Sequence, residues 1–242
     1  MTNPAFKMSY AEKQERHSQK RACLLQFLAS GEVYTTLQVA AQLLNASERT
    51  TLRLLQKLVE EKLLKIDLKV MPHTNLKLYG VSEHGLAMTK NANQKAKPFM
   101  LSRTNPSWVQ HHIDGQLIRI KAEANGWKNY LPGKLLMVEN AARLKKLPDA
   151  LVSRPDDRKV AIEIERYVKS RKRMTDVIAA HLSQIIEKKY DFVYYFTPHK
   201  PALDRAFAAV QFVAMDTKKI QLNDTHRARF KTFNLSKWNG EM

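Results

Sequence analysis

The stretch that decides the fold of the second half is Leu147-Pro148-Asp149-Ala150, followed by Val160-Ala161-Ile162-Glu163-Ile164-Glu165. Side chains alternate between the two faces of a strand, so Glu163 and Glu165 share one face of the second segment. If a strand ending near Asp149 pairs with this segment, three carboxylates converge. Clustered anions need a cation, and oxygen ligands of this kind suit Mg²⁺ or Mn²⁺. The pattern is therefore typical of a metal-dependent phosphodiesterase site.

The charge of the chain favours a polyanionic partner. The 242 residues include 41 Lys and Arg against 23 Asp and Glu, a formal net charge of +18. The first hundred residues hold 15 of these cations and eight of the anions, so the excess is spread over both halves. Nucleic acid is the default partner for such a chain. No apolar run approaches 18 residues, which predicts a soluble, cytoplasmic protein without membrane insertion.

A single cysteine, Cys23, limits the sulfur chemistry of the chain. It excludes an internal disulfide and a zinc site built from several thiolates. Because Cys23 precedes Leu24-Leu25, we expect it to be a small buried hydrophobic residue.

The first hundred residues predict three helices followed by a hairpin. Residues 11–29 and 36–44 have helical apolar spacing, and Ser47 is a typical N-cap for a helix to about residue 61. Residues 64–70 and 76–81 alternate apolar and polar side chains, as strands do. This order resembles the winged helix-turn-helix superfamily over about residues 12–88. The polar segment 89–106 reads as a linker, and the predicted domains are 1–97 and 98–242.

In winged helix-turn-helix proteins, the second helix of the pair enters the major groove, and the hairpin can touch the DNA backbone. The resemblance therefore implies DNA-binding residues on that helix and around the hairpin: Ser47, Arg49, Thr50, Thr51, Arg53, Gln56, Lys69, His73, Asn75 and Lys77. Two alternatives are a domain that mediates protein contacts and an ordinary solvated face at Arg49 and Arg53.

The second half predicts a mixed sheet flanked by helices. Helices are expected at 107–125, 170–189 and 201–215, although residues 211–214 alternatively form a strand. Strands are expected at 127–130, 134–139, 146–152, 159–166 and 191–196. With Pro148-Asp149 and Glu163-x-Glu165, this order resembles the restriction-endonuclease-like fold of the PD-(D/E)xK nucleases. The expected fold class is α+β or α/β. The alternative is an edge strand with two solvated glutamates.

The resemblance implies a metal site and its ligands. Asp149 and Glu163 would hold Mg²⁺ or Mn²⁺, with the carbonyl of Ile164 joining the coordination. The lysine usual in this family is replaced by Glu165, which would act as a metal ligand or a general base. Lys169 or Arg171 would then supply the positive charge, and the implied catalytic set is Asp149, Glu163, Glu165 and Lys169. The basic run Lys169, Arg171, Lys172 and Arg173 is expected to neutralise phosphates.

The whole chain, from about residue 14 to 212, resembles a narrower family. The predicted winged helix, the pair His111-His112, and Glu165-Arg166 followed by a basic helix are similar to the replication-relaxation proteins, which include MobC-type relaxases of mobilisable plasmids. The family implies a site- and strand-specific endonuclease that nicks the origin of transfer with an accessory relaxosome protein and a coupling protein. Tyr167 is then a candidate nucleophile for a covalent route, or else a packing or phosphate contact. His111 and His112 would contact phosphate or lie on an ordinary polar surface.

Two other functions stay open. One is a plasmid replication initiator or transcriptional regulator that binds DNA through the winged helix without cleavage. The other is a restriction endonuclease that cuts both strands, which would normally act as a dimer.

Overall fold

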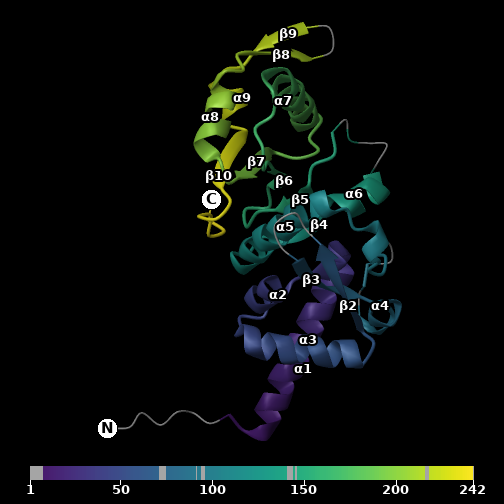
Figure 1. The fold of residues 1–242 in the computed structure, drawn as a ribbon. Helices are drawn as coiled ribbons and strands as arrows, with labels where there is room; N and C mark the ends of the chain where they lie inside the picture. The colour runs from purple at the N-terminus through teal and green to yellow at the C-terminus, as the bar shows by residue number, and fades with distance from the viewer. Residues whose placement is uncertain are drawn as a thin grey trace. The chain divides into compact units, whose positions relative to one another are not determined.

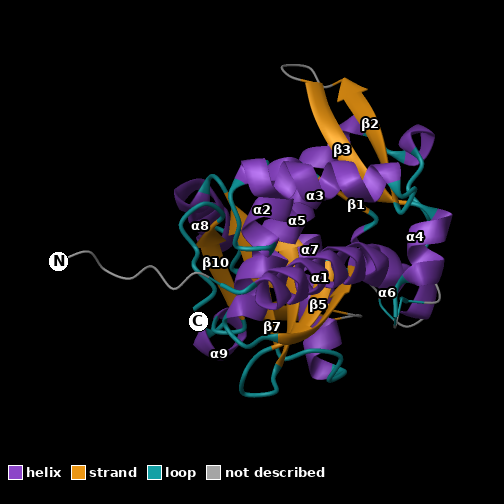
Figure 2. Cartoon of the chain, turned by 90° about the horizontal axis from the view of Figure 1, so that it is seen from below, coloured by secondary structure: helices purple, strands orange, loops and turns teal. Residues whose placement is uncertain are grey.

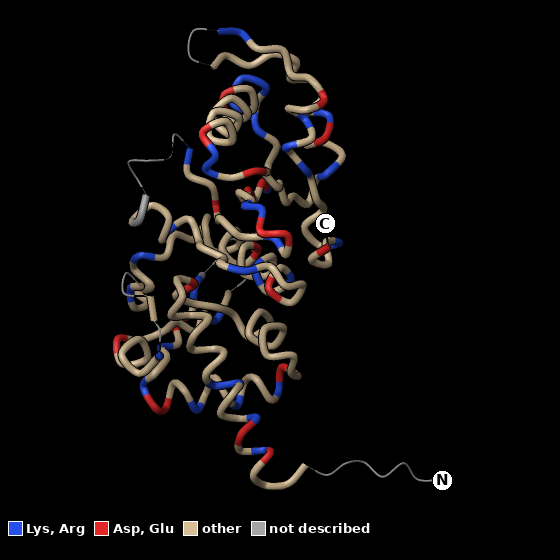
Figure 3. Tube along the Cα trace, turned by 180° about the vertical axis from the view of Figure 1, so that it is seen from behind, with Lys and Arg blue, Asp and Glu red and all other residues tan. Residues whose placement is uncertain are grey.

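The computed structural model divides the chain into two compact units, Met1–Pro106 and Ser107–Met242, nine residues beyond the predicted boundary (Figure 1). It describes residues 8–70, 75–90, 92–93, 96–140, 144, 146–215 and 218–241. Lys and Arg lie along both units (Figure 3). Within these described ranges, no helix is both long and apolar enough to cross a membrane.

Unit 1 contains the helices and the hairpin that the sequence predicts. Its elements are α1 (Tyr10–Phe27), a π-helical turn (Leu28–Glu32), β1 (Tyr34–Thr35), α2 (Leu37–Leu43), α3 (Glu48–Glu60), β2 (Leu64–Val70), β3 (Asn75–Val81), α4 (Glu83–Met88) and a 3₁₀ turn (Leu101–Arg103). The strands form an antiparallel sheet in the order β1-β3-β2. The β2–β3 hairpin extends past the helices of its unit (Figure 2).

Local sequence explains where these helices begin. Ser9, Thr36, Ser47 and Ser82 each accept a hydrogen bond from the backbone N–H three residues on, which satisfies a donor that the helix itself leaves unpaired. On α3 the buried leucines are spaced to face the core of the unit, and the charged residues face outward. Cys23 is exposed, so its predicted burial is wrong. It lies on the side of α1 opposite the packed leucines.

Unit 2 is built around a mixed sheet of five strands in the order β10-β7-β6-β5-β4. Strands β10, β7 and β6 are parallel, whereas β5 and β4 are antiparallel to their neighbours. The elements are α5 (Pro106–Ala124), β4 (Lys128–Pro132), α6 (Gly133–Asn140), β5 (Ala150–Ser153), β6 (Lys159–Ile164), α7 (Arg171–Ile186), β7 (Phe192–Thr197), α8 (Lys200–Ala208), β8 (Phe212–Met215), β9 (Lys218–Gln221), α9 (Asp224–Arg227) and β10 (Phe230–Asn234). Strands β8 and β9 form a separate hairpin.

Helices cover both faces of this sheet. Ile118 and Ala122 of α5 pack on the face that carries Val160, Ile162 and Ile164 of β6. The other face carries Ala161, and there the packing residues come from α7 and α8: Met174, Ile178, Leu182 and Leu203. The mixed α and β class, with flanking helices, is as predicted. Because α7 covers the face that also carries Glu163, the site lies beneath a helix.

Several predicted elements differ from those observed. Residues 134–139, predicted as a strand, belong to α6, where Leu135 and Leu136 are buried and Met137 and Val138 are exposed, a helical pattern rather than an alternating one. The helix predicted over 201–215 ends at Ala208, and its last residues form β8. Strands β9 and β10 and helix α9 have no counterpart among the elements predicted from the sequence. Asp149 lies in the turn just before β5 rather than within the strand.

Gly133 generates a prediction about the turn that holds Asp149. Its N–H donates to the carbonyl of Asp149 at 2.7 Å, and a Cβ at this position would lie 2.8 Å from the carbonyl oxygen of Pro148. These are backbone atoms that cannot move aside, so we expect Gly133→Ala to lower the free energy of unfolding by about 1–3 kcal/mol, measured by urea denaturation.

Gly115 of α5 provides the matched control. A Cβ there would lie 3.4 Å from the terminal methyl group of the Ile164 side chain, an ordinary contact with a flexible group. Because Gly is a poor helix former, Gly115→Ala should raise the free energy of unfolding by about 0.5–1 kcal/mol. Equal effects of the two substitutions would contradict the role given to Gly133.

Candidate functional site

Asp149 is fastened to β6 by two hydrogen bonds. Its N–H donates to the carbonyl of Ile162 at 3.0 Å, and its Oδ2 accepts from the N–H of Ile164 at 2.7 Å. Because Ala150 pairs with Ile162 in the β5–β6 register, Asp149 lies opposite Glu163. The N–H and C=O of a strand residue point to the same side, so the Ile164 carbonyl is directed toward Asp149. The predicted pairing of the segment at Asp149 with the strand that carries Glu163 is observed.

Glu163 is the most deeply buried carboxylate of the site, with 5% of the residue exposed. Its Oε1 forms an ion pair with Nζ of Lys146 and lies 3.3 Å from Nε2 of His181. Burial alone raises the pKa of Glu163, but the contact with His181 and the charge of Lys146 outweigh it and hold the pKa below its usual value. Glu163 is therefore ionised and compensated at neutral pH.

A ring of hydrogen bonds fixes these partners in place. The Gln184 amide nitrogen donates to the carbonyl of Lys146 at 3.0 Å and to the hydroxyl of Tyr190 at 2.9 Å. Tyr190 in turn lies 2.6 Å from Nδ1 of His181. Burial, opposed by Glu163, lowers the pKa of His181, so the ring is neutral at pH 7. The Tyr190 hydroxyl then donates to Nδ1, and the Nε2 proton faces Glu163.

Glu165 and Lys169 form a second ion pair beside the first. Glu165 is 8% exposed, and the Lys169 side chain is 15% exposed. Burial lowers the pKa of Lys169, while the charges of Glu163 and Asp149 act in the opposite direction. Lys169 is thus within electrostatic reach of all three carboxylates. In this structure Glu165 is an ion-pair partner.

His111 of α5 completes the cluster. Its Nε2 lies 3.2 Å from Oδ2 of Asp149, and the edge of its ring packs on Trp108, with 5.3 Å between ring centroids. Burial lowers the pKa of His111, but the hydrogen bond and charge of Asp149 more than offset this and raise it overall. His111 is therefore held directly against Asp149.

The structure brings together five of the predicted site residues: Asp149, Glu163, Ile164, Glu165 and Lys169. Arg171, Lys172 and Arg173 form the exposed first turn of α7, next to Lys169. Tyr167 is 81% exposed, and no hydrogen bond joins it to the cluster in the described residues.

Sequence reasoning missed four groups that hold the carboxylates: Lys146, His181, Gln184 and Tyr190. Lys146 falls in the segment predicted as a strand, and His181 and Gln184 fall within the helix predicted over 170–189. The only available signal was the presence of polar residues at inward helical positions, because Gln184 and His181 lie three residues apart on one face. Their partners are set by how α7 packs on the sheet.

The donor set fits a hard divalent cation in kind, since Asp149, Glu163 and the Ile164 carbonyl all supply oxygen atoms. Among the residues that the structure describes, no three His, Cys, Asp or Glu side chains are arranged as a group that could hold a metal. Asp149 and Glu163 each use one oxygen to bind a cationic or polar partner. A metal ion would compete with Lys146 and His111 for these two carboxylates.

On unit 1, the predicted DNA-binding residues of α3 lie on its outer face. Ser47, Arg49, Thr50 and Arg53 are exposed, and Ser47 also caps the helix by accepting from the Thr50 N–H at 3.3 Å. Thr51 does not lie on this face. It is 1% exposed, and its hydroxyl donates to the carbonyl of Ser47, so its predicted role is wrong.

On the hairpin, Asn75 and Lys77 are exposed, and Lys69 is half-buried. His73 lies outside the described residues. The exposed Gln56 of α3 extends the same outer face by one turn.

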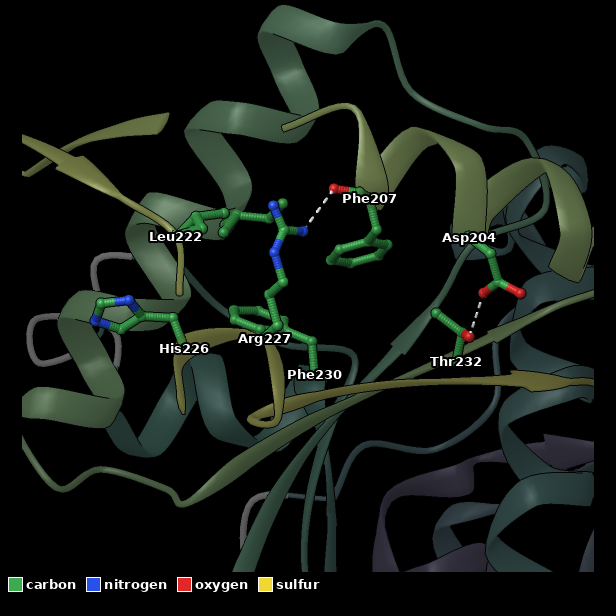
Figure 4. Close-up of a pocket in the computed structure, with 8 residues that line it drawn as sticks. Asp204, Phe207, Leu222, His226, Arg227, Phe230 and Thr232 are labelled. Atoms are coloured by element: carbon green, nitrogen blue, oxygen red, sulfur yellow. Dashed lines mark hydrogen bonds between the residues drawn. The ribbon is translucent and has the colours of Figure 1, made fainter. Parts of the chain in front are cut away.

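A separate cavity of about 180 Å³ opens between α7, α8, α9 and β10, away from the carboxylates (Figure 4). Its polar groups are occupied by neighbours within the unit. Arg227 donates to the carbonyls of Phe207 and Val210, and Asp204 accepts from Thr232 and Lys200. No predicted site residue lines it.

Comparison with models of protein families found no match for this chain. Comparisons with curated proteins and with solved structures found no match either.

His181 generates a prediction about pH. Its pKa is lowered from 6.5 by burial, so unfolding takes up a proton, and the stability that the neutral ring contributes is lost as the pH falls. We expect the free energy of unfolding of the wild type to decrease from about pH 6.5 to 5, and His181→Gln to flatten that slope. The slope is measured by urea denaturation across this range.

His17→Gln, on the exposed part of α1, is the control and should keep the wild-type slope. Glu163 titrates in the same sense but below its ordinary value of 4.5, outside this window. An unchanged slope in His181→Gln would show that His181 is not buried neutral against Glu163.

The Lys146–Glu163 pair generates a second prediction. Lys146→Met removes the cation beside Glu163, whose side chain is only 6% exposed, and leaves the neutral His181 as its remaining partner. This substitution should therefore lower the free energy of unfolding by about 3 kcal/mol. Lys146→Met combined with Glu163→Gln should cost less, because no buried charge remains unpaired. Lys200→Met, which breaks a pair whose side chains are about 40% exposed, should cost less than about 1 kcal/mol. Additive effects of Lys146→Met and Glu163→Gln would contradict the pairing.

Proposed function

We propose that the chain is a DNA endonuclease that depends on Mg²⁺ or Mn²⁺. The observation that carries this proposal is the buried ionic cluster around Glu163, which ends beside the basic first turn of α7. Burying several charges together costs free energy that an apolar core would not, and perturbed titratable groups are typical of functional sites. A cluster of carboxylates bounded by lysines is suited to phosphodiester chemistry.

The first turn of α7 supports a phosphate-binding role. Ser170 caps the helix, and the next three residues are Arg171, Lys172 and Arg173, with no acidic residue in the turn. Cations at a helix N-terminus are unfavourable, because the backbone N–H groups there already carry partial positive charge. A phosphate would be bound by both the side chains and the helix end.

In this proposal Asp149, Glu163 and the Ile164 carbonyl hold the metal ion. The ion would polarise a phosphate oxygen and lower the pKa of a water molecule. Lys169 places positive charge beside the scissile phosphate, and His181 keeps Glu163 oriented. Glu165 serves as the partner of Lys169. The exposed Tyr167 forms no hydrogen bond with the cluster in the described part of the chain, so we propose attack by water rather than a covalent intermediate.

We further propose that unit 1 is a winged helix-turn-helix that selects the DNA. The exposed Arg49, Arg53 and Lys77 are suited to base and phosphate contacts. Together the two units are consistent with a relaxase-type enzyme that nicks an origin of transfer on one strand in the cytoplasm. Its partners would be an accessory relaxosome protein and a coupling protein.

One observation favours a second candidate function. Glu163 and Glu165 already have cationic partners in Lys146 and Lys169, and Asp149 is contacted by His111. A cluster whose carboxylates all have partners without a metal would also suit a replication initiator or transcriptional regulator that binds DNA through unit 1 and does not cut it.

The test is incubation with supercoiled plasmid that carries the DNA surrounding the gene, with Mg²⁺, Mn²⁺ or EDTA. We expect metal-dependent open circles, a loss of more than about 100-fold in Glu163→Gln, and a loss of about 10–100-fold in His181→Gln. Asp176→Asn is the matched control and should retain activity. It removes an exposed carboxylate from α7, the helix that carries His181.

Each alternative gives a different product. Linear DNA would indicate cleavage of both strands, and a protease-sensitive DNA adduct that is lost in Tyr167→Phe would indicate the covalent route. Sequence-specific binding without scission, with the accessory protein present, would replace the endonuclease with the regulator or initiator.

A further inference from the structure

The first part of α1 extends beyond the core of unit 1. Residues 9–19 are all exposed, and Figure 1 draws this part of α1 beyond α3. A helix of this length with no packing partner is only marginally stable in water. A capping box at Ser9 and Glu12 and a hydrogen bond from Gln19 to Glu15 support it locally. Its side chains are therefore available to a ligand.

The basic residues in the exposed part of α1 lie on one face of the helix. Lys13, Arg16, His17 and Lys20 are spaced at i, i+3, i+4 and i+7, which places them on one side. Continuing the same spacing reaches the buried Leu24 and Phe27. The side of α1 that faces its own unit therefore changes from apolar to basic. The acidic residue Glu15 lies on the other side, and Glu12 lies one turn before Arg16 at the edge of the basic face.

Across a groove, this basic face meets the basic face of α3. His17 and Lys20 of α1 line the groove together with Thr50, Arg53 and Lys57 of α3, and the floor is formed by Leu44, Ala46, Thr51 and Leu54. His17, Lys20, Arg53 and Lys57 form no ion pair with any residue in the described ranges. Like charges that face each other without a counter-charge destabilise the protein unless an anion lies between them.

We propose that the groove between α1 and α3 binds one strand of a DNA phosphate backbone, with α1 as a clamp beside the helix that enters the major groove. Charge complementarity selects this occupant. A second copy of the helix would bring more positive charge, and the exposed turns have no apolar stripe to bury against it. The inference rests on the proposed DNA binding by unit 1 and adds a contact site on a helix outside the helix-turn-helix pair.

The test compares two variants of the full chain. Lys20→Gln/Lys57→Gln removes two cations that line the groove, one from each helix. A second variant combines these changes with Gln19→Lys and Ala22→Lys on the exposed side of α1 away from the groove, so the net charge of the chain is restored. Binding to a fluorescein-labelled duplex of random sequence is measured by anisotropy over a range of salt concentrations. Circular dichroism checks that α1 remains helical.

We expect both variants to bind about tenfold more weakly at low salt, and the slope of log affinity against log salt to flatten by about two phosphate contacts. Wild-type affinity in the second variant would overturn the proposal, because net charge alone would then explain binding. Wild-type affinity in the first variant would also overturn it. If the wild type itself binds no duplex, DNA binding by unit 1 fails, a result distinct from failure of the groove alone.

Discussion

The buried carboxylate of Glu163 is the constraint on which much of unit 2 depends. A charge that water cannot reach must be matched inside the protein, and here the matching groups come from two separate segments. Lys146 approaches from the loop before β5, and His181 approaches from α7. Gln184 then ties the Lys146 backbone to the same helix. Lys146 and α7 are therefore tied to the same carboxylate of β6.

Such an arrangement is not the most stable one that this fold could contain. Replacing a buried ion pair by apolar residues of similar volume is often neutral or stabilising. The same holds for the first turn of α7, where cations oppose the helix dipole, and for the cationic faces of α1 and α3. Three places in two units thus carry unfavourable positive charge or buried ions. Binding of nucleic acid, as proposed above, would offset the positive charge at the first turn of α7 and on the faces of α1 and α3, but not the cost of the buried carboxylates.

The sequence predicted those features that depend on short-range periodicity. Alternation over residues 159–166 placed Glu163 and Glu165 together, and the N-cap at Ser47 located the start of α3. It failed at residues 134–139, because a short apolar run fits a strand or a helix equally well until burial is known. It also missed β10, which pairs in parallel with β7 although the sequence between them runs through α8, α9 and a hairpin. Pairings between residues so far apart leave no local signal.

The candidate site also combines residues that the sequence predicted with residues that it did not. The carboxylates could be predicted because they lie on one strand and the turn beside it, whereas their cations come from elsewhere. Position 165 at the end of the strand carries Glu rather than a cation. Lys169, four residues after Glu165, forms an ion pair with it. Positive charge at the cluster is therefore supplied by Lys169 and Lys146 rather than by the strand itself. The charge balance of the site thus depends on how α5, α7 and the loop before Asp149 are packed.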